Sequence, residues 1–112
     1  MNRSCLHCVL ARVLGAEGDR IRARGLEVRL SPAAAVFLPA PGRATYRALR
    51  GLLRSAIGDA EGPRIRLTLV NLPGKSHVEV MAAFSVARGT RVLSCAFPRH
   101  DPAALAAGIL GQ

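Results

Sequence analysis

The sequence predicts an α+β domain in which helices cover one face of a mixed sheet of about five strands. Apolar residues recur at helical spacing near the start, in the middle and at the end of the chain, and they alternate with polar residues between these segments. The expected helices are too few to cover both faces of the sheet, which favours a two-layer sandwich with one open face. The 112 residues suffice for one core, so residues 1–112 are expected to form a single domain.

The first helix is expected over residues 5–24, with Gly15 and Gly18 as its weak points. Its apolar side chains at helical spacing are Leu6, Val9, Leu10, Val13 and Ile21. Gly25 is typical of a helix end, and residues 26–30 alternate between apolar and charged as in a strand with one buried face. An apolar run over residues 35–38, between two prolines, predicts a second, short strand.

The second helix is expected to begin near Arg43 and to end at Ile57. Its apolar stripe consists of Leu49, Leu52, Leu53, Ala56 and Ile57. Three strands follow, over residues 64–70, 77–84 and 91–97, and the short turns between them indicate an antiparallel meander. The residues expected on the open face of the sheet are Arg29, Arg64, Arg66, Thr68, Glu79 and Met81.

A last helix is expected over residues 102–110, after Asp101 as its N-cap. It is almost wholly Ala, Leu and Ile, so it must be buried somewhere. Two places are open to it: the exposed face of the sheet, or a homodimer contact with a second copy.

The charge and composition restrict the partners of this chain. The formal net charge is +9, and of the sixteen lysine and arginine residues only Lys75 is lysine. Such a chain is attracted to acidic surfaces and to phosphate polymers. No apolar stretch approaches the length of a membrane helix and the start of the chain lacks a secretory signal, so we expect a cytoplasmic protein with no membrane partner.

Arginines on the second helix are the sharpest candidate for a binding surface. Arg43, Arg47, Arg50 and Arg54 follow one another at spacings of four, three and four, which places them on one helix face. Few acidic residues lie at helical offsets from them, which favours an external anionic partner, although a solvated face in an arginine-rich protein is an equal alternative. With Arg64 and Arg66 of the sheet face, they form the predicted partner-binding set.

Cysteines offer a second, weaker candidate site. Cys5-x-x-Cys8 at the start of a helix is compatible with a redox pair or with half of a zinc site. The second half could only be Cys95 with His100, and a single Cys-x-x-Cys match is a weak signal. We therefore expect reduced thiols, without a metal or other cofactor.

Several segments together are similar to one family. The similarity lies in the order and spacing of four segments. They are the first helix with Gly25-Leu-Glu-Val-Arg-Leu30, the stretch Arg47-Ala-Leu-Arg-Gly-Leu-Leu-Arg-Ser-Ala-Ile57, then Arg64-Ile-Arg-Leu-Thr-Leu69, and finally Gly89-Thr-Arg-Val-Leu-Ser-Cys-Ala-Phe-Pro98. Residues 6–98 thus resemble the histidine-kinase catalytic and ATP-binding (Bergerat-like) domain. The resemblance implies a two-layer α+β fold and a place in two-component signalling.

The resemblance fails at the positions that bind nucleotide in active members. The family pattern Asn-Leu-Leu-x-Asn-Ala-Ile, whose second Asn holds the magnesium ion of ATP, here begins with Gly51 and has Ser55 at the second position. The family's Asp-x-Gly-x-Gly motif, lid and second glycine-rich loop should follow Phe84, where this chain has only Ser85-Val-Ala-Arg-Gly-Thr90.

The resemblance therefore implies a domain without a competent ATP site, which is not a working kinase. We expect a non-catalytic protein-interaction module that docks an acidic protein surface, such as a response regulator or a kinase. One alternative is a small basic nucleic-acid-associated protein that uses the same arginines. Another is a residual ATP-binding subunit, in which Ser55 replaces the asparagine and a partner supplies the missing loops.

Overall fold

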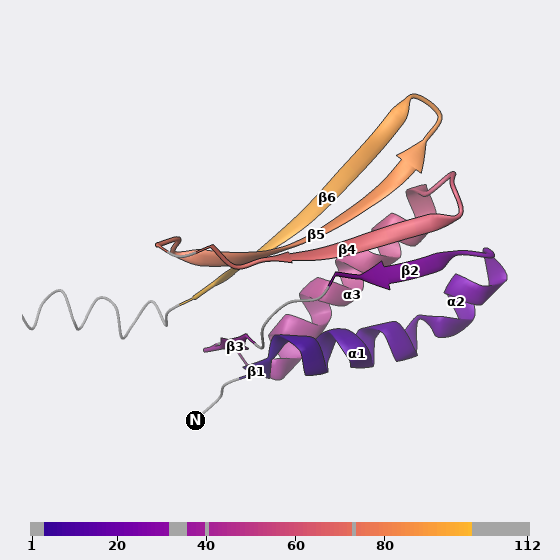
Figure 1. The fold of residues 1–112 in the computed structure, drawn as a ribbon. Helices are drawn as coiled ribbons and strands as arrows, with labels where there is room; N and C mark the ends of the chain where they lie inside the picture. The colour runs from indigo at the N-terminus through magenta and orange to yellow at the C-terminus, as the bar shows by residue number, and fades with distance from the viewer. Residues whose placement is uncertain (1–3, 32–35, 40, 73, 100–112) are drawn as a thin grey trace, which may run out of the picture.

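The computed structural model describes residues 4–31, 36–39, 41–72 and 74–99 (Figure 1). Its elements, in chain order, are β1 (Ser4–Cys5), α1 (Leu6–Ala16), α2 (Gly18–Ala23), β2 (Glu27–Leu30), β3 (Phe37–Leu38), α3 (Gly42–Asp59), β4 (Arg64–Val70), β5 (His77–Val86) and β6 (Gly89–Pro98). None of the helices in these ranges is long and apolar enough to cross a membrane.

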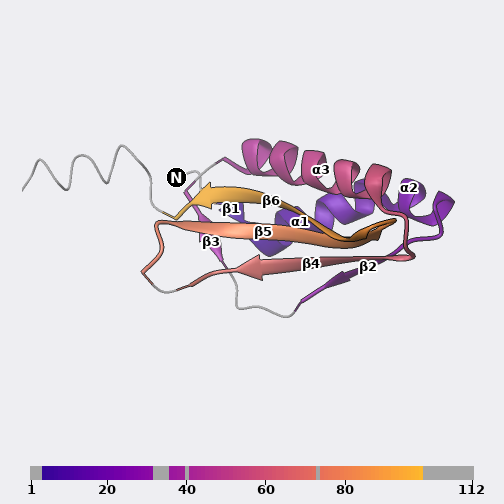
Figure 2. The same cartoon turned by 90° about the horizontal axis from the view of Figure 1, so that it is seen from above.

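The main sheet has four strands in the order β2-β4-β5-β6. β2 runs parallel to β4, and α3 is the helix that connects the two. β4, β5 and β6 form an antiparallel meander, as expected. Figures 1 and 2 show α1 and α3 on the same side of this sheet. The α+β class, the mixed sheet and the helices on one face are thus confirmed.

The short strand expected over residues 35–38 does not enter the main sheet. β3 covers residues 37–38 and pairs with β1 in a separate two-stranded sheet, with Ser4 opposite Leu38. The Leu6 N–H also donates to the Val36 carbonyl. Val36 and Leu38 are buried while Phe37 is exposed. This segment therefore satisfies its backbone against the start of α1, and the main sheet has four strands instead of about five.

The helix expected over residues 5–24 is two helices in the structure. α1 ends at Ala16, and Glu17 separates it from α2. The backbone N–H of Glu17 donates to the carbonyls of Gly15 and Val13. The break falls between the two predicted weak points. α2 ends at Ala23, and Gly25 terminates it as expected: its φ of 63° lets its N–H reach the Arg22 carbonyl while the Leu26 N–H reaches that of Ile21.

The core lies between the helices and the inner face of the sheet. It combines the apolar stripes of α1 and α3 with alternate residues of β4 and β5: Leu6, Leu10, Val13, Leu49, Leu53, Ile65, Leu67, Val78, Val80, Ala82 and Phe84. All strand residues predicted to face inward on β4 and β5 are buried. The strand period of two thus places the intervening residues on the outer face.

The outer face of the sheet carries the six residues predicted there. Arg29, Arg64 and Arg66 are exposed, and Thr68, Glu79 and Met81 are half-buried. The last helix, expected over residues 102–110, lies outside the described residues, so neither of its two expected positions is tested.

β5 and β6 are joined by a turn of only two residues, Ala87 and Arg88. Val86 pairs with Gly89 directly after the turn. Gly89 has a φ of 123°, a conformation that residues with a Cβ rarely adopt. The chain therefore passes from Phe84, paired with Arg91, into the last strand of the sheet without an intervening segment.

Replacing Leu53 by alanine should test the placement of the core. Leu53 is 1% exposed on α3, so the cavity should lower the free energy of unfolding by about 2–5 kcal/mol. Urea denaturation measures this loss. Val92, which is 48% exposed on β6, is the control, and Val92→Ala should cost less than about 1 kcal/mol. Equal losses in the two variants would contradict this packing.

Candidate functional site

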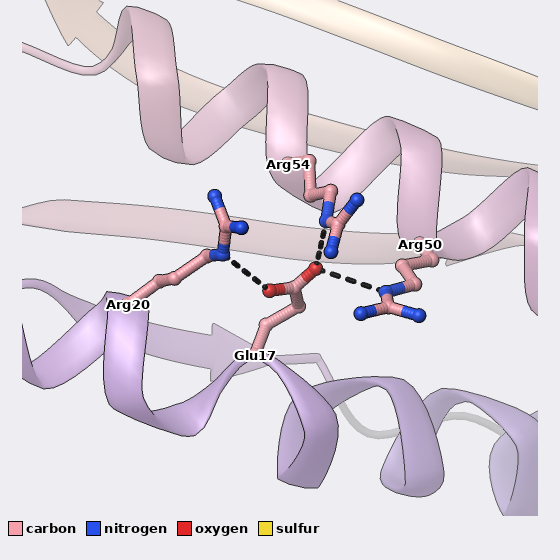
Figure 3. A network of polar contacts seen from close by, with 4 residues as sticks. All are labelled: Glu17, Arg20, Arg50 and Arg54. Carbon is pink, nitrogen blue, oxygen red and sulfur yellow. Dashed lines mark hydrogen bonds and ion pairs between the residues drawn. The ribbon is translucent and has the colours of Figure 1, made fainter.

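A buried carboxylate at the junction of α1 and α2 organises the arginines of the helical layer (Figure 3). The side chain of Glu17 is 1% exposed. Its Oε1 accepts from Arg54 Nε at 2.5 Å and from Arg50 Nε at 3.2 Å, both from α3. Its Oε2 lies 3.3 Å from Arg20 Nε of α2. We call Glu17, Arg20, Arg50 and Arg54 the arginine cluster.

The sequence places Glu17 where a core residue would be expected. Leu6, Leu10, Val13 and Glu17 follow at spacings of four, three and four, so the carboxylate continues the buried stripe of α1. A buried carboxylate is tolerated only with charged or hydrogen-bonding partners. Arg50 and Arg54 are four residues apart on α3, which brings both to the same side of that helix.

The arginines keep Glu17 ionised. Burial by itself raises the pKa of this carboxyl group, but hydrogen bonds from Arg54 and Arg50 and the charges of Arg54 and Arg20 outweigh it, so the pKa lies below its usual range. Three guanidinium groups and one carboxylate leave two positive charges in excess. The arginine cluster is therefore a cationic part of the surface.

An aromatic ring extends these contacts to α1. The guanidinium carbon of Arg12, on α1, lies 5.3 Å from the centre of the Tyr46 ring, and that of Arg50 lies 5.9 Å from it. Both distances are within the range of a cation–π contact. Arg50 thus contacts both the Glu17 carboxylate and the ring of Tyr46 on its own helix, while Arg12 joins α1 to α3 through the same ring.

The structure divides the predicted arginine stripe into two pairs. Arg50 and Arg54 belong to the arginine cluster. Arg43 and Arg47 are exposed and form no ion pair with any described residue. Glu17 does not lie at a helical offset from these arginines, because it comes from the junction of α1 and α2, so the charge pattern of α3 does not reveal it. The signal for Glu17 was a charge on the apolar stripe of α1.

Arg64 and Arg66 lie on the opposite side of the molecule from the stripe. They alternate with the inward-facing Ile65 and Leu67, whereas α3 packs on the inner face. Glu27 approaches Arg29 at 2.5 Å and Arg64 at 3.6 Å, and Arg66 has no ion pair with any described residue. The six predicted arginines therefore form two surfaces, which one flat partner cannot cover together.

A groove of about 470 Å³ runs between α3 and β6. Gly51 and Ser55 line it, together with Arg47, Leu93 and Cys95. A Cβ on Gly51 would meet no other atom within 4 Å, so the missing side chain leaves open space. The two positions at which the sequence departs from the nucleotide-binding pattern thus lie in one groove.

The cysteines are all free thiols. The Cys8 N–H donates to Cys5 Sγ at 3.4 Å, so Cys5 caps the start of α1. Hydrogen bonds from the Cys8 side chain and backbone lower the pKa of Cys5, whereas burial raises that of Cys95. The part of the chain that the structure describes contains no group of three or more His, Cys, Asp or Glu residues that could hold a metal ion. His100 lies outside it.

Comparison with known proteins identifies the fold but no sequence relative. No family model matches the sequence, and a search of curated proteins finds no significant match. Among solved structures, the Acinetobacter baumannii histidine kinase AdeS is similar with a TM-score of 0.66 and 12% identity, over 90% of this chain and 69% of that one.

Two further histidine kinases show the same likeness. The catalytic domain of histidine kinase ThkA matches with a TM-score of 0.65 and 18% identity, over 76% of this chain and 58% of that domain. The mycobacterial sensor histidine kinase MprB matches with a TM-score of 0.57 and 18% identity, over 73% of this chain and 52% of that one. The chain thus has the fold of a histidine-kinase catalytic, ATP-binding domain, while it spans little more than half of these two structures.

Replacing Glu17 by glutamine should destabilise the protein at neutral pH. Three arginines would lose their counter-charge, at a cost of about 1–3 kcal/mol in the free energy of unfolding. Because the folded-state pKa of Glu17 is lowered, its stabilisation is present above the ordinary glutamate pKa and is lost as the pH falls through the folded-state value. Urea denaturation should therefore show the two proteins converging below about pH 4.

Glu61→Gln is the matched control for this experiment. Glu61 is exposed, and its carboxylate forms no ion pair with the described residues. Its replacement should change the free energy of unfolding by less than about 0.5 kcal/mol. A difference between wild type and Glu17→Gln that stays constant from about pH 7 to about pH 3 would contradict the ionised, paired state of Glu17.

Proposed function

We propose that this chain is a non-catalytic protein-interaction module of two-component-type signalling, which docks an acidic protein surface through the exposed arginines of α3. The observation that carries the proposal is the two-residue turn between β5 and β6 in a fold shared with histidine-kinase catalytic domains. The turn replaces the segment in which the family resemblance places the adenine reader, the lid and the phosphate loop.

The residues that line the groove beside α3 are a poor fit for a nucleoside triphosphate. Such a ligand requires backbone N–H donors from a loop and a coordinated cation that neutralises the phosphates. Gly51 offers no side chain, and Ser55 offers one hydroxyl on a shorter arm than the asparagine amide. Among the groove residues, Arg47 carries a positive charge and Asp59 a carboxylate, and that carboxylate is paired with Arg91 at 3.2 Å. These features support a role without ATP turnover.

Arg43 and Arg47 are the best candidates for the docking contact. They are exposed, they lie one helical turn apart on α3, and no described carboxylate neutralises them. Arg64, by contrast, shares Glu27 with Arg29. The net charge of +9 accelerates the approach of an acidic partner. A receiver-type response regulator or a kinase is the partner class that the family resemblance suggests.

Reversing two charges on α3 should weaken docking. We expect Arg43→Glu with Arg47→Glu to reduce the affinity for a cognate receiver domain about tenfold, mostly through the association rate. Fluorescence anisotropy with a labelled receiver domain at several salt concentrations measures this. The control, Arg64→Glu with Arg66→Glu, makes the same charge change on the opposite face.

Equal weakening by the two double variants would contradict the assignment to α3. If the protein binds duplex DNA more tightly than it binds the receiver domain, and the DNA affinity falls steeply with salt, a nucleic-acid-associated protein would be favoured instead.

Introducing the two asparagines of the family pattern should not produce nucleotide binding. Gly51→Asn with Ser55→Asn fits the open groove, but the segment that would hold adenine and phosphates remains absent. We expect no saturable thermal shift with Mg-ATP or Mg-ADP in this variant or in the wild type. A shift of the wild type that Ser55→Trp abolishes and Arg20→Gln leaves intact would place nucleotide in the groove and overturn the proposal.

A further inference from the structure

We propose that the guanidinium groups of Arg20, Arg50 and Arg54 bind a phosphate monoester carried on a polypeptide, with Glu17 as the anchor that holds them in place. This site is separate from the docking arginines Arg43 and Arg47, and it does not depend on the groove between α3 and β6. The inference follows from three properties of the arginine cluster: the atoms that its internal contacts leave unused, its fixed geometry and its net charge.

The contacts with Glu17 leave most donors of the three arginines unused. Each guanidinium reaches the carboxylate through its Nε atom. An arginine carries five N–H donors, four of which are on the two Nη atoms. The Nη atoms of these three side chains form no hydrogen bond with any described residue. Arginine uses these Nη donors to form paired hydrogen bonds with a phosphate.

The donors are also held in a fixed arrangement that solvent can reach. Figure 3 shows the three guanidinium groups converging on Glu17 from α2 and α3. The carboxylate itself is buried, whereas the side chains of Arg20, Arg50 and Arg54 are 62%, 38% and 43% exposed. A ligand would therefore meet an arrangement already ordered by Glu17 and, at Arg50, by the Tyr46 ring. Preordering of this kind reduces the entropy lost on binding.

The excess charge selects the class of anion. Three guanidinium groups less one carboxylate leave a charge of two, which a phosphate monoester with about −1.5 to −2 charges at neutral pH balances. A single carboxylate or a phosphodiester, with one charge each, would leave the cluster cationic. Because the cluster lies on the surface of the helical layer, the backbone on either side of a phosphorylated side chain can add contacts. A free phosphate ion cannot make these additional contacts.

Fluorescence anisotropy with three labelled peptides tests the proposal. They share one neutral sequence and carry serine, aspartate or phosphoserine at the centre. We expect the phosphoserine peptide to bind at least about tenfold more tightly than either of the others. Arg20→Gln should remove about tenfold of this affinity, since it deletes one guanidinium while both contacts of α3 with Glu17 remain.

Arg43→Gln with Arg47→Gln is the matched control, because it removes two charges from α3 outside the arginine cluster. It should leave the preference for phosphoserine unchanged. Arg50→Lys with Arg54→Lys keeps the charge of the cluster but removes the planar forks, and it should lower the preference about as much as Arg20→Gln does. Circular dichroism establishes that each variant is folded.

Two outcomes would overturn the proposal. One is an equal affinity for the aspartate and phosphoserine peptides. The other is inorganic phosphate that binds as tightly as the phosphoserine peptide, which would make the site one for a free ion. The docking experiment uses other variants and another ligand, so the failure of either proposal leaves the other one standing.

Discussion

The ionised side chain of Glu17 sits where an apolar residue would otherwise complete the seam between α1 and α3, and the helical layer is built around it. An unpaired charge at a position that is 1% exposed would be costly. Arg50 and Arg54 can reach it only when α3 lies alongside the junction of α1 and α2, and Arg20 only when the chain turns into a second helix directly after Glu17. One carboxylate thereby restricts the positions of three helices. The apolar contacts supply most of the stabilisation, while the ion pairs define which arrangement of the helices is compatible with it.

The local elements could be predicted from the sequence because their signals lie within a few residues of each other. Ile65, Leu67 and Leu69 alternate with polar residues, and this alternation predicts both the strand and its buried face. Gly25 marks the end of a helix for the same local reason. β3 was harder to place because two residues carry no periodicity, and its partner, β1, is equally short. Its pairing depends on where α1 starts, which is a tertiary property.

The candidate site could be predicted in part. The spacing from Arg43 to Arg54 identifies a common helix face, and the structure confirms that all four residues lie on α3. Whether such arginines face solvent or an internal carboxylate depends on a residue more than thirty positions away, since Glu17 is separated from Arg50 by 33 residues and from Arg54 by 37. No pattern of charges within one helix contains that information. What the sequence did contain was the anomaly of Glu17 on an apolar stripe.

The direct hairpin from β5 to β6 has a further consequence for how copies of the chain behave toward one another. In the described part of the molecule, β6 is the last strand of the main sheet, and it is ten residues long. Its far side presents backbone amides and carbonyls that a second strand could pair with, and Arg91 is its only charged residue. Mutual repulsion between molecules of charge +9 opposes such pairing of strand edges. At 0.1 M salt this repulsion is screened at distances beyond about 10 Å. The arginine content therefore acts on colloidal stability as well as on recognition.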